Sequence, residues 1–192
     1  TLLKIAMGVA QADGGTVEWG YEAQYGYFSQ DHEALEAAEG ETVLSWLWRY
    51  AADKHEGFVR GKLAQVLFVR DDVDKRVRSL SGGESTRMVL AQLGLVQPNV
   101  LVLDEPTNHL DFEGIEALAA GLDDYPGTLI FVSHNRWFVE QLATRILEIR
   151  PDGLADYRGS YREYLAHCGD DHLDAEMAAA NARRERQLHK RA

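Results

Sequence analysis

The chain has 192 residues, of which 45% are hydrophobic and 27% are charged, a composition typical of a globular domain rather than a disordered segment. No apolar stretch approaches the roughly 18 residues that a membrane-spanning helix needs, and the N-terminus does not resemble a signal peptide, so no membrane insertion is expected. The single cysteine, Cys168, can form no disulfide within the chain, and the net charge of −11 argues against a large nucleic-acid patch on the main body.

The C-terminal end differs in charge from the rest. Residues 176–192 carry five basic and two acidic side chains, a net charge of +3, whereas the preceding residues sum to −14. We expect residues 167–192 to form a charged, flexible tail. Two interpretations stay open: a solvated helix or frayed end, and a contact to an anionic partner such as RNA.

Apolar periodicity and turn residues predict strands that alternate with helices, which indicates an α/β fold with a mostly parallel sheet. Strands are expected at residues 16–19, 25–29, 100–103, 128–132, 145–149 and 154–157. Helices are expected at residues 1–7, 43–50, 58–67, 85–96, 112–122, 136–143 and 161–166. The connections include an acidic loop at 31–41, a turn at 71–74 and a type I hairpin turn at 150–153. Residues from about 42 to 97 are expected to form a small helical lobe.

An apolar run at residues 100–103 ends abruptly at Asp104 and Glu105, and Pro106 stops the strand. Mg²⁺ prefers oxygen ligands, usually one or two carboxylates with water and phosphates, and Asp104 suits that role. Glu105, one residue further on, could polarise a water for attack on a γ-phosphate. For this pair by itself, an ordinary strand-to-turn junction is the alternative.

Residues 81–84 (Ser-Gly-Gly-Glu) are expected to open the helix at 85–96. The N–H groups at such a helix end are free, and glycines let an anion approach them closely. A plain capping box between Ser81 and Glu84 is the alternative. Two consecutive glycines weaken a helix, which favours the anion-binding interpretation.

Gln30 and His134 each end a predicted strand, as Asp104 does. If the strands share one sheet, all three residues lie at the same edge. An imidazole there can hydrogen-bond a γ-phosphate or a bound water, and a neutral amide can contact a metal ion or its water. Either residue alone would mean little.

Together these segments resemble the ATP-binding cassette (ABC) family. Residues 80–84 resemble its signature motif, residues 100–105 its Walker B strand, and residues 108–111 its D-loop. His134 resembles the switch histidine and Gln30 the Q-loop glutamine. The order of these segments along the chain also fits the family.

The resemblance implies one cassette domain over residues 1–166, partial at its N-terminus. Residues 104–111 (Asp-Glu-Pro-Thr-Asn-His-Leu-Asp) and 159–164 (Gly-Ser-Tyr-Arg-Glu-Tyr) are similar to the ABC-F branch, cytosolic twin-cassette ATPases that act on ribosomes. The short interval between Gln30 and Leu80 resembles the second cassette of that branch, because the first usually carries an inserted helical arm there.

The family's roles then pass to the matching positions, with ATP and Mg²⁺ as the implied ligands. Asp104 and Gln30 would contact the metal. Glu105 would be the catalytic carboxylate, and His134 would sense the γ-phosphate. The remaining implied nucleotide and interface contacts are Thr1, Ser81, Gly82, Gly83, Glu84 and Asp111.

Three departures from the family pattern matter. The phosphate-binding loop and the adenine-stacking aromatic residue are not in this sequence, and Thr1 would be the last remnant of that loop. This stretch alone is therefore expected to bind ATP poorly and to be inactive. Asn135 stands where an aspartate is common after the switch histidine, and Ser85-Thr86 replaces a polar-basic pair after the signature.

The leading functional hypothesis is an ATP-hydrolysing cassette of a cytoplasmic ABC-F protein that couples ATP to a conformational step in translation. Its partners would be a second cassette of the same full-length chain and the ribosome or its RNA. Two alternatives stay open: the nucleotide-binding subunit of an ABC transporter, and a nucleotide-dependent interaction module without turnover.

Overall fold

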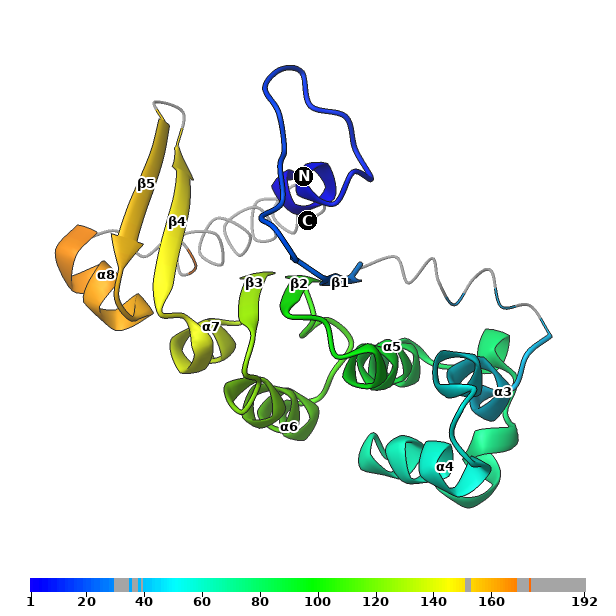
Figure 1. Ribbon diagram of the computed structural model, residues 1–192. Coiled ribbons are helices and arrows are strands. Elements are labelled where there is room, and N and C mark those ends of the chain that lie inside the picture. Colours follow the sequence, from blue (N-terminus) through cyan, green and yellow to red (C-terminus); the bar gives the residue numbers. More distant parts are fainter. Residues whose placement is uncertain (30–34, 36–37, 39, 151–152, 169–172, 174–192) are drawn as a thin grey trace, which may run out of the picture. The chain divides into compact units, whose positions relative to one another are not determined.

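The computed structural model describes residues 1–29, 35, 38, 40–150, 153–168 and 173 (Figure 1). The described residues form two compact units: residues 1–115 with 124–132, and residues 116–123 with those from Ser133 onward. Helix α6 (Phe112–Asp123) begins in the first unit and continues in the second. No helix in the described ranges is long and apolar enough to cross a membrane.

A parallel three-stranded sheet organises the first unit, and its strands lie side by side in the order β1-β2-β3 (Figure 1). They are β1 (Tyr25–Phe28), β2 (Val100–Asp104) and β3 (Thr128–Val132). The strands predicted at 25–29, 100–103 and 128–132 are confirmed, and so is the α/β class. Parallel pairing brings the carboxyl ends of all three strands to one edge of the sheet.

The middle strand is apolar because both of its faces are covered. Leu101, Val102 and Leu103 are 7%, 1% and 0% exposed. The register places Leu103 beside Phe28 of β1, and Asp104 beside Val132 of β3. Asp104 is thus the first polar side chain that this central strand presents at the carboxyl edge.

Helix α5 (Gly82–Val96) packs against β1 and confirms the helix predicted at 85–96, with an earlier start. The close approach depends on Gly26. A Cβ at this position would lie 2.7 Å from Cδ2 of Leu93 and 2.8 Å from Cγ of Pro98. The glycine therefore lets the strand and the helix meet without a side chain between them.

Short helices fill the chain between the acidic loop and α5. They are α3 (Val43–Trp48), η1 (Arg49–Ala51), α4 (Glu56–Gln65), η2 (Arg70–Asp74) and η3 (Val77–Ser79). Trp46, Leu47 and Leu63 are fully buried among them. Both helices predicted in this region are present, although the limits of a separate lobe stay a prediction.

Caps explain where these helices begin. The Thr42 and Ser45 side chains each accept the other's backbone N–H, at 3.1 and 2.9 Å, and start α3. Nδ1 of His55 accepts the N–H of Phe58 at 3.2 Å. Helix α4 therefore begins at Glu56, two residues before the start predicted from apolar spacing alone.

The strand predicted at residues 16–19 is wrong. This segment has no regular structure, and Val17 is 53% exposed. Trp19 lies instead against helix α1 (Leu2–Ala6): its Nε1 donates to the carbonyl of Ala6 at 3.1 Å, and its ring stacks on Tyr25 with centroids 5.0 Å apart. Alternation alone does not make a strand when no described strand lies alongside to take its hydrogen bonds.

The second unit contains an antiparallel hairpin flanked by helices. Its elements are α7 (Arg136–Leu142), β4 (Arg145–Arg150), β5 (Gly153–Arg158) and α8 (Tyr161–Cys168). Tyr164 Oη donates to Glu148 Oε2 at 2.6 Å and ties α8 to β4. Glu163 Oε2 accepts the N–H of Ser160 at 2.8 Å, which confirms the predicted capping box.

Several predictions fall outside the described residues. They concern Gln30, most of the acidic loop at 31–41, positions 151 and 152 of the hairpin turn, and nearly all of the tail at 167–192.

Candidate active site

Asp104 and Glu105 follow one another at the carboxyl edge of β2. Tyr27 Oη, from β1, donates to Asp104 Oδ2 over 3.5 Å. Glu105 has a φ of 52°, a left-handed conformation that is uncommon for a residue with a side chain. Its N–H donates to the carbonyl of Val132 at 2.9 Å, and the residue is only 8% exposed. The backbone therefore turns directly after Asp104 and holds Glu105 in a buried position beside β3.

Two tight turns lead from Glu105 to helix α6. The N–H of Asn108 donates to the carbonyl of Glu105 at 3.2 Å, and the N–H of Leu110 donates to the carbonyl of Thr107 at 3.3 Å. Asp111 then caps the helix, because its Oδ1 accepts the N–H of Gly114 at 2.9 Å. The D-loop is thus held at one end by the carboxylate edge and at the other by a helix cap.

Ser81 and Glu84 form the predicted capping box at the start of α5. Ser81 Oγ accepts the N–H of Glu84 at 3.3 Å, and Glu84 Oε2 accepts the N–H of Ser81 at 2.8 Å. Glu84 Oε1 also pairs with Lys75 Nζ at 2.9 Å. The Ser81 N–H first, and Lys75 second, hold the pKa of Glu84 below its ordinary value. The Glu84 carboxylate therefore stabilises the conformation of residues 81–84.

We expect Glu84→Gln to lower the free energy of unfolding by about 1 kcal/mol at neutral pH, because the amide loses the charge that Ser81 N–H and Lys75 favour. The folded-state pKa is depressed, so this stability is present above the unfolded pKa and is lost as pH falls through the folded value. Denaturant unfolding of both proteins across a pH series measures the difference. A difference that persists unchanged in acid would contradict the assignment.

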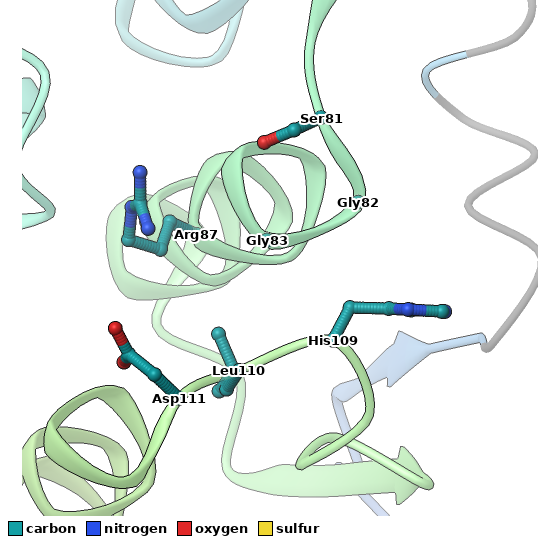
Figure 2. A pocket seen from close by; sticks show the side chains of 7 residues that line it. All are labelled: Ser81, Gly82, Gly83, Arg87, His109, Leu110 and Asp111. Carbon is teal, nitrogen blue, oxygen red and sulfur yellow. The ribbon is translucent and has the colours of Figure 1, made fainter.

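An open pocket of about 430 Å³ lies between the start of α5 and the turn that precedes α6 (Figure 2). Its lining combines the signature motif and the D-loop: Ser81, Gly82, Gly83, Arg87, His109, Leu110 and Asp111. The structure therefore brings these two predicted segments together in the first unit. Asp104 and Glu105 do not line this pocket.

Arg87 contributes a cation to the pocket that the motifs of the sequence do not predict. Its guanidinium lies over the Phe68 ring, with Cζ 5.7 Å from the centroid. Its Nε is buried and makes no hydrogen bond within the described part of the chain. Helical spacing could have predicted this position of Arg87, because it lies four residues after Gly83 and therefore on the same face of α5.

The remaining predicted residues have other local settings. His134 belongs to the second unit and follows Ser133. Asn135 caps α7, because its Oδ1 accepts the N–H of Phe138 at 2.9 Å. The amide at this unusual position therefore has a structural use, as an aspartate would. Thr1 precedes α1, and its carbonyl accepts the N–H of Ile5 at 3.0 Å.

The carboxyl edge has donors that suit a magnesium ion. The described residues contain no group of three or more His, Cys, Asp and Glu side chains arranged around one point. Mg²⁺ is usually bound by one or two carboxylates together with substrate phosphates, rather than by a cage of protein ligands. The half-buried carboxylate of Asp104 fits an ion that arrives with a nucleotide.

The parallel sheet, the capped glycine helix and the acidic strand end define a nucleotide-binding domain of the cassette type. A family model described as "ABC transporter" matches residues 1–108, more than half of the chain. The chain belongs to the ATP-binding cassette family, in its ABC-F branch.

Individual relatives agree with this placement. "Probable ATP-binding protein YbiT" of Escherichia coli O157:H7 is 48% identical over 171 residues, which cover 88% of this chain and 32% of that protein. "ABC transporter F family member 2" of Arabidopsis thaliana is 34% identical over all of this chain and 27% of its own length. The chain thus spans about a third or less of these relatives.

Solved structures share the fold. The structure titled "RNase-L Inhibitor" superposes with a TM-score of 0.63 at 25% identity, over 88% of this chain and 34% of that one. A metal-chelate type ABC transporter in an inward-facing conformation superposes with a TM-score of 0.58 at 17% identity, over 82% and 66%. The likeness to the transporter concerns the fold alone.

Proposed function

We propose that the full-length protein hydrolyses ATP and that this chain supplies the chemistry of one cassette. The observation that carries the proposal is the edge of β2, where Asp104 and a buried, left-handed Glu105 follow one another. Phosphoryl transfer asks the protein mainly for positioning and neutralisation of charge. In this proposal Asp104 and Gln30 hold Mg²⁺, Glu105 polarises the attacking water, and His134 contacts the γ-phosphate.

The pocket at the start of α5 serves the second cassette in this proposal. The N–H groups of a helix start attract anions, and Gly82 and Gly83 leave room for close approach. Ser81 and these glycines would contact the γ-phosphate of a nucleotide held by the partner cassette. Asp111 would lie at the interface between the two. Thr1 would be the end of the phosphate-binding loop in the full-length protein.

The protein's proposed biological target is the ribosome, in the cytoplasm. Two features support this target. The amino-acid sequences of residues 104–111 and 159–164 are similar to the ABC-F branch, and two relatives are named as F family members. The positive charge of residues 176–192 suits an anionic partner such as RNA.

Co-sedimentation with ribosomes tests the target. We expect the full-length protein carrying Glu105→Gln to sediment with ribosomes in ATP and to remain in the supernatant in ADP. No ATP-dependent association in either wild type or variant would contradict the ribosomal part. Co-purification with membranes would favour a transporter subunit instead, and wild-type protein without ATP turnover would favour an interaction module.

A further inference from the structure

His109 occupies a backbone conformation that is uncommon for a residue with a side chain. Its φ is 65°, in the left-handed region that glycine adopts freely and that other residues, histidine more often than most, adopt uncommonly. The residue is exposed, so burial of its side chain does not explain its presence there. Uncommon backbone conformations that persist on a surface often mark functional positions.

The signature glycines lie directly against this residue. A Cβ at Gly82 would lie 3.1 Å from Cγ and 3.3 Å from Cβ of His109. A Cβ at Gly83 would lie 3.0 Å from the carbonyl oxygen of His109. The first turn of α5 therefore rests on both the side chain and the backbone of His109, at the pocket of Figure 2.

Each side of this contact is fixed independently. On one side, Glu84 belongs to the capping box of α5, and its Oε1 pairs with Lys75 Nζ at 2.9 Å. On the other side, Asp111 caps α6 at 2.9 Å, two residues after His109. His109 therefore forms a direct contact between these two capped segments.

We propose that His109 is a positioning residue that keeps the signature glycines in register with the D-loop of the same cassette. The proposal rests on the proposed function, in which both segments contact a nucleotide and a partner cassette together. The imidazole does not touch substrate in this account. The Cβ, Cγ and carbonyl oxygen of His109 determine the position of the first turn of α5.

His109→Gly in the full-length protein separates positioning from stability. Glycine suits a φ of 65°, so the unfolding midpoint should stay equal or rise, while the contact with Gly82 is lost. We expect ATP turnover to fall about tenfold, since small misplacements of contacting groups cost one to two orders of magnitude. Hydrogen exchange of the nucleotide-free protein should be about tenfold faster over residues 80–85, because the start of α5 loses its support.

Two further variants make the test specific. Gln97 is exposed at the opposite end of α5 with a φ of 49°, so Gln97→Gly relieves the same conformation without touching the signature and should leave turnover and exchange unchanged. His109→Asn keeps a Cβ and a Cγ and tolerates the left-handed conformation, so it should restore both properties to within about twofold.

The outcomes are distinguishable from those of the proposed function. Unchanged exchange over residues 80–85 in His109→Gly would overturn the inference, as would altered exchange with normal turnover. Failure of His109→Asn to restore turnover would also overturn it. Wild-type protein without Glu105-dependent turnover would contradict the proposed function, whatever the exchange of His109→Gly.

Discussion

Glu105→Gln in the full-length protein should lower ATP turnover by about two to four orders of magnitude while ATP binding is retained. Glutamine has the shape of glutamate and fills the same buried position, so the fold and the hydrogen bond from the Glu105 N–H to Val132 should persist. The amide cannot accept a proton or polarise water as a carboxylate does. Steady-state phosphate release and equilibrium ATP binding measure the two properties separately.

Glu113→Gln is the matched control for this substitution. Glu113 is exposed in the first turn of α6, close to the D-loop in sequence, and the same charge is removed. Its turnover should stay within about twofold of wild type, as is usual for surface substitutions. Normal turnover in Glu105→Gln would show that Glu105 takes no part in hydrolysis. Equal losses of turnover in both variants would show that the loss of one negative charge, and not the position of Glu105, is responsible.

Trp46→Ala should lower the free energy of unfolding by about 3–5 kcal/mol, the largest effect on stability that we expect. The side chain is 0% exposed and is the largest fully buried one among the helices that precede α5. Its ring also packs edge-on against Tyr50, with the ring centroids 5.2 Å apart. The Cζ of Arg49 lies over the same ring, 5.2 Å from its centroid. Denaturant unfolding followed by far-ultraviolet circular dichroism measures the change.

Trp48→Ala provides the comparison, because Trp48 lies two residues away on α3 and is only half-buried. Its Nε1 donates to the carbonyl of Lys54 at 3.0 Å. We expect this variant to cost about 1–2 kcal/mol. Similar losses from Trp46 and Trp48 would contradict the assignment of Trp46 to the core of these helices.

The strands that could be predicted are those whose pattern is set by burial. β2 is a short apolar run bounded by turn residues and is covered on both faces, as its pattern indicates. β3 has the same apolar pattern and forms the predicted strand, but Ile130 and Val132 on one of its faces are exposed. Residues 16–19 alternate like a strand but form none, because pairing is a property of neighbours and not of the segment itself. The early start of α4 was missed for a related reason, since histidine is not among the residues that usually cap helices.

The candidate site was predictable in its residue types and not in its geometry. Asp104, Glu105 and the Ser81–Glu84 capping box follow from local spacing along the chain. The left-handed conformations of Glu105 and His109 do not, because neither is a glycine or asparagine that would signal them. Lys75, which pairs with Glu84 nine residues later, belongs to no local pattern, and Arg87 needed the helix register to be recognised.

In the proposed function, the Asp104–Glu105 edge holds magnesium and ATP for hydrolysis. The most direct measurement is the amount of ATP retained by the full-length Glu105→Gln protein after gel filtration, with Mg²⁺ and with excess EDTA. We expect ATP to be retained in Mg²⁺ and lost in EDTA, because the ion requires both the Asp104 carboxylate and the phosphates. Absence of retained ATP in Mg²⁺, or equal retention in EDTA, would contradict the claim.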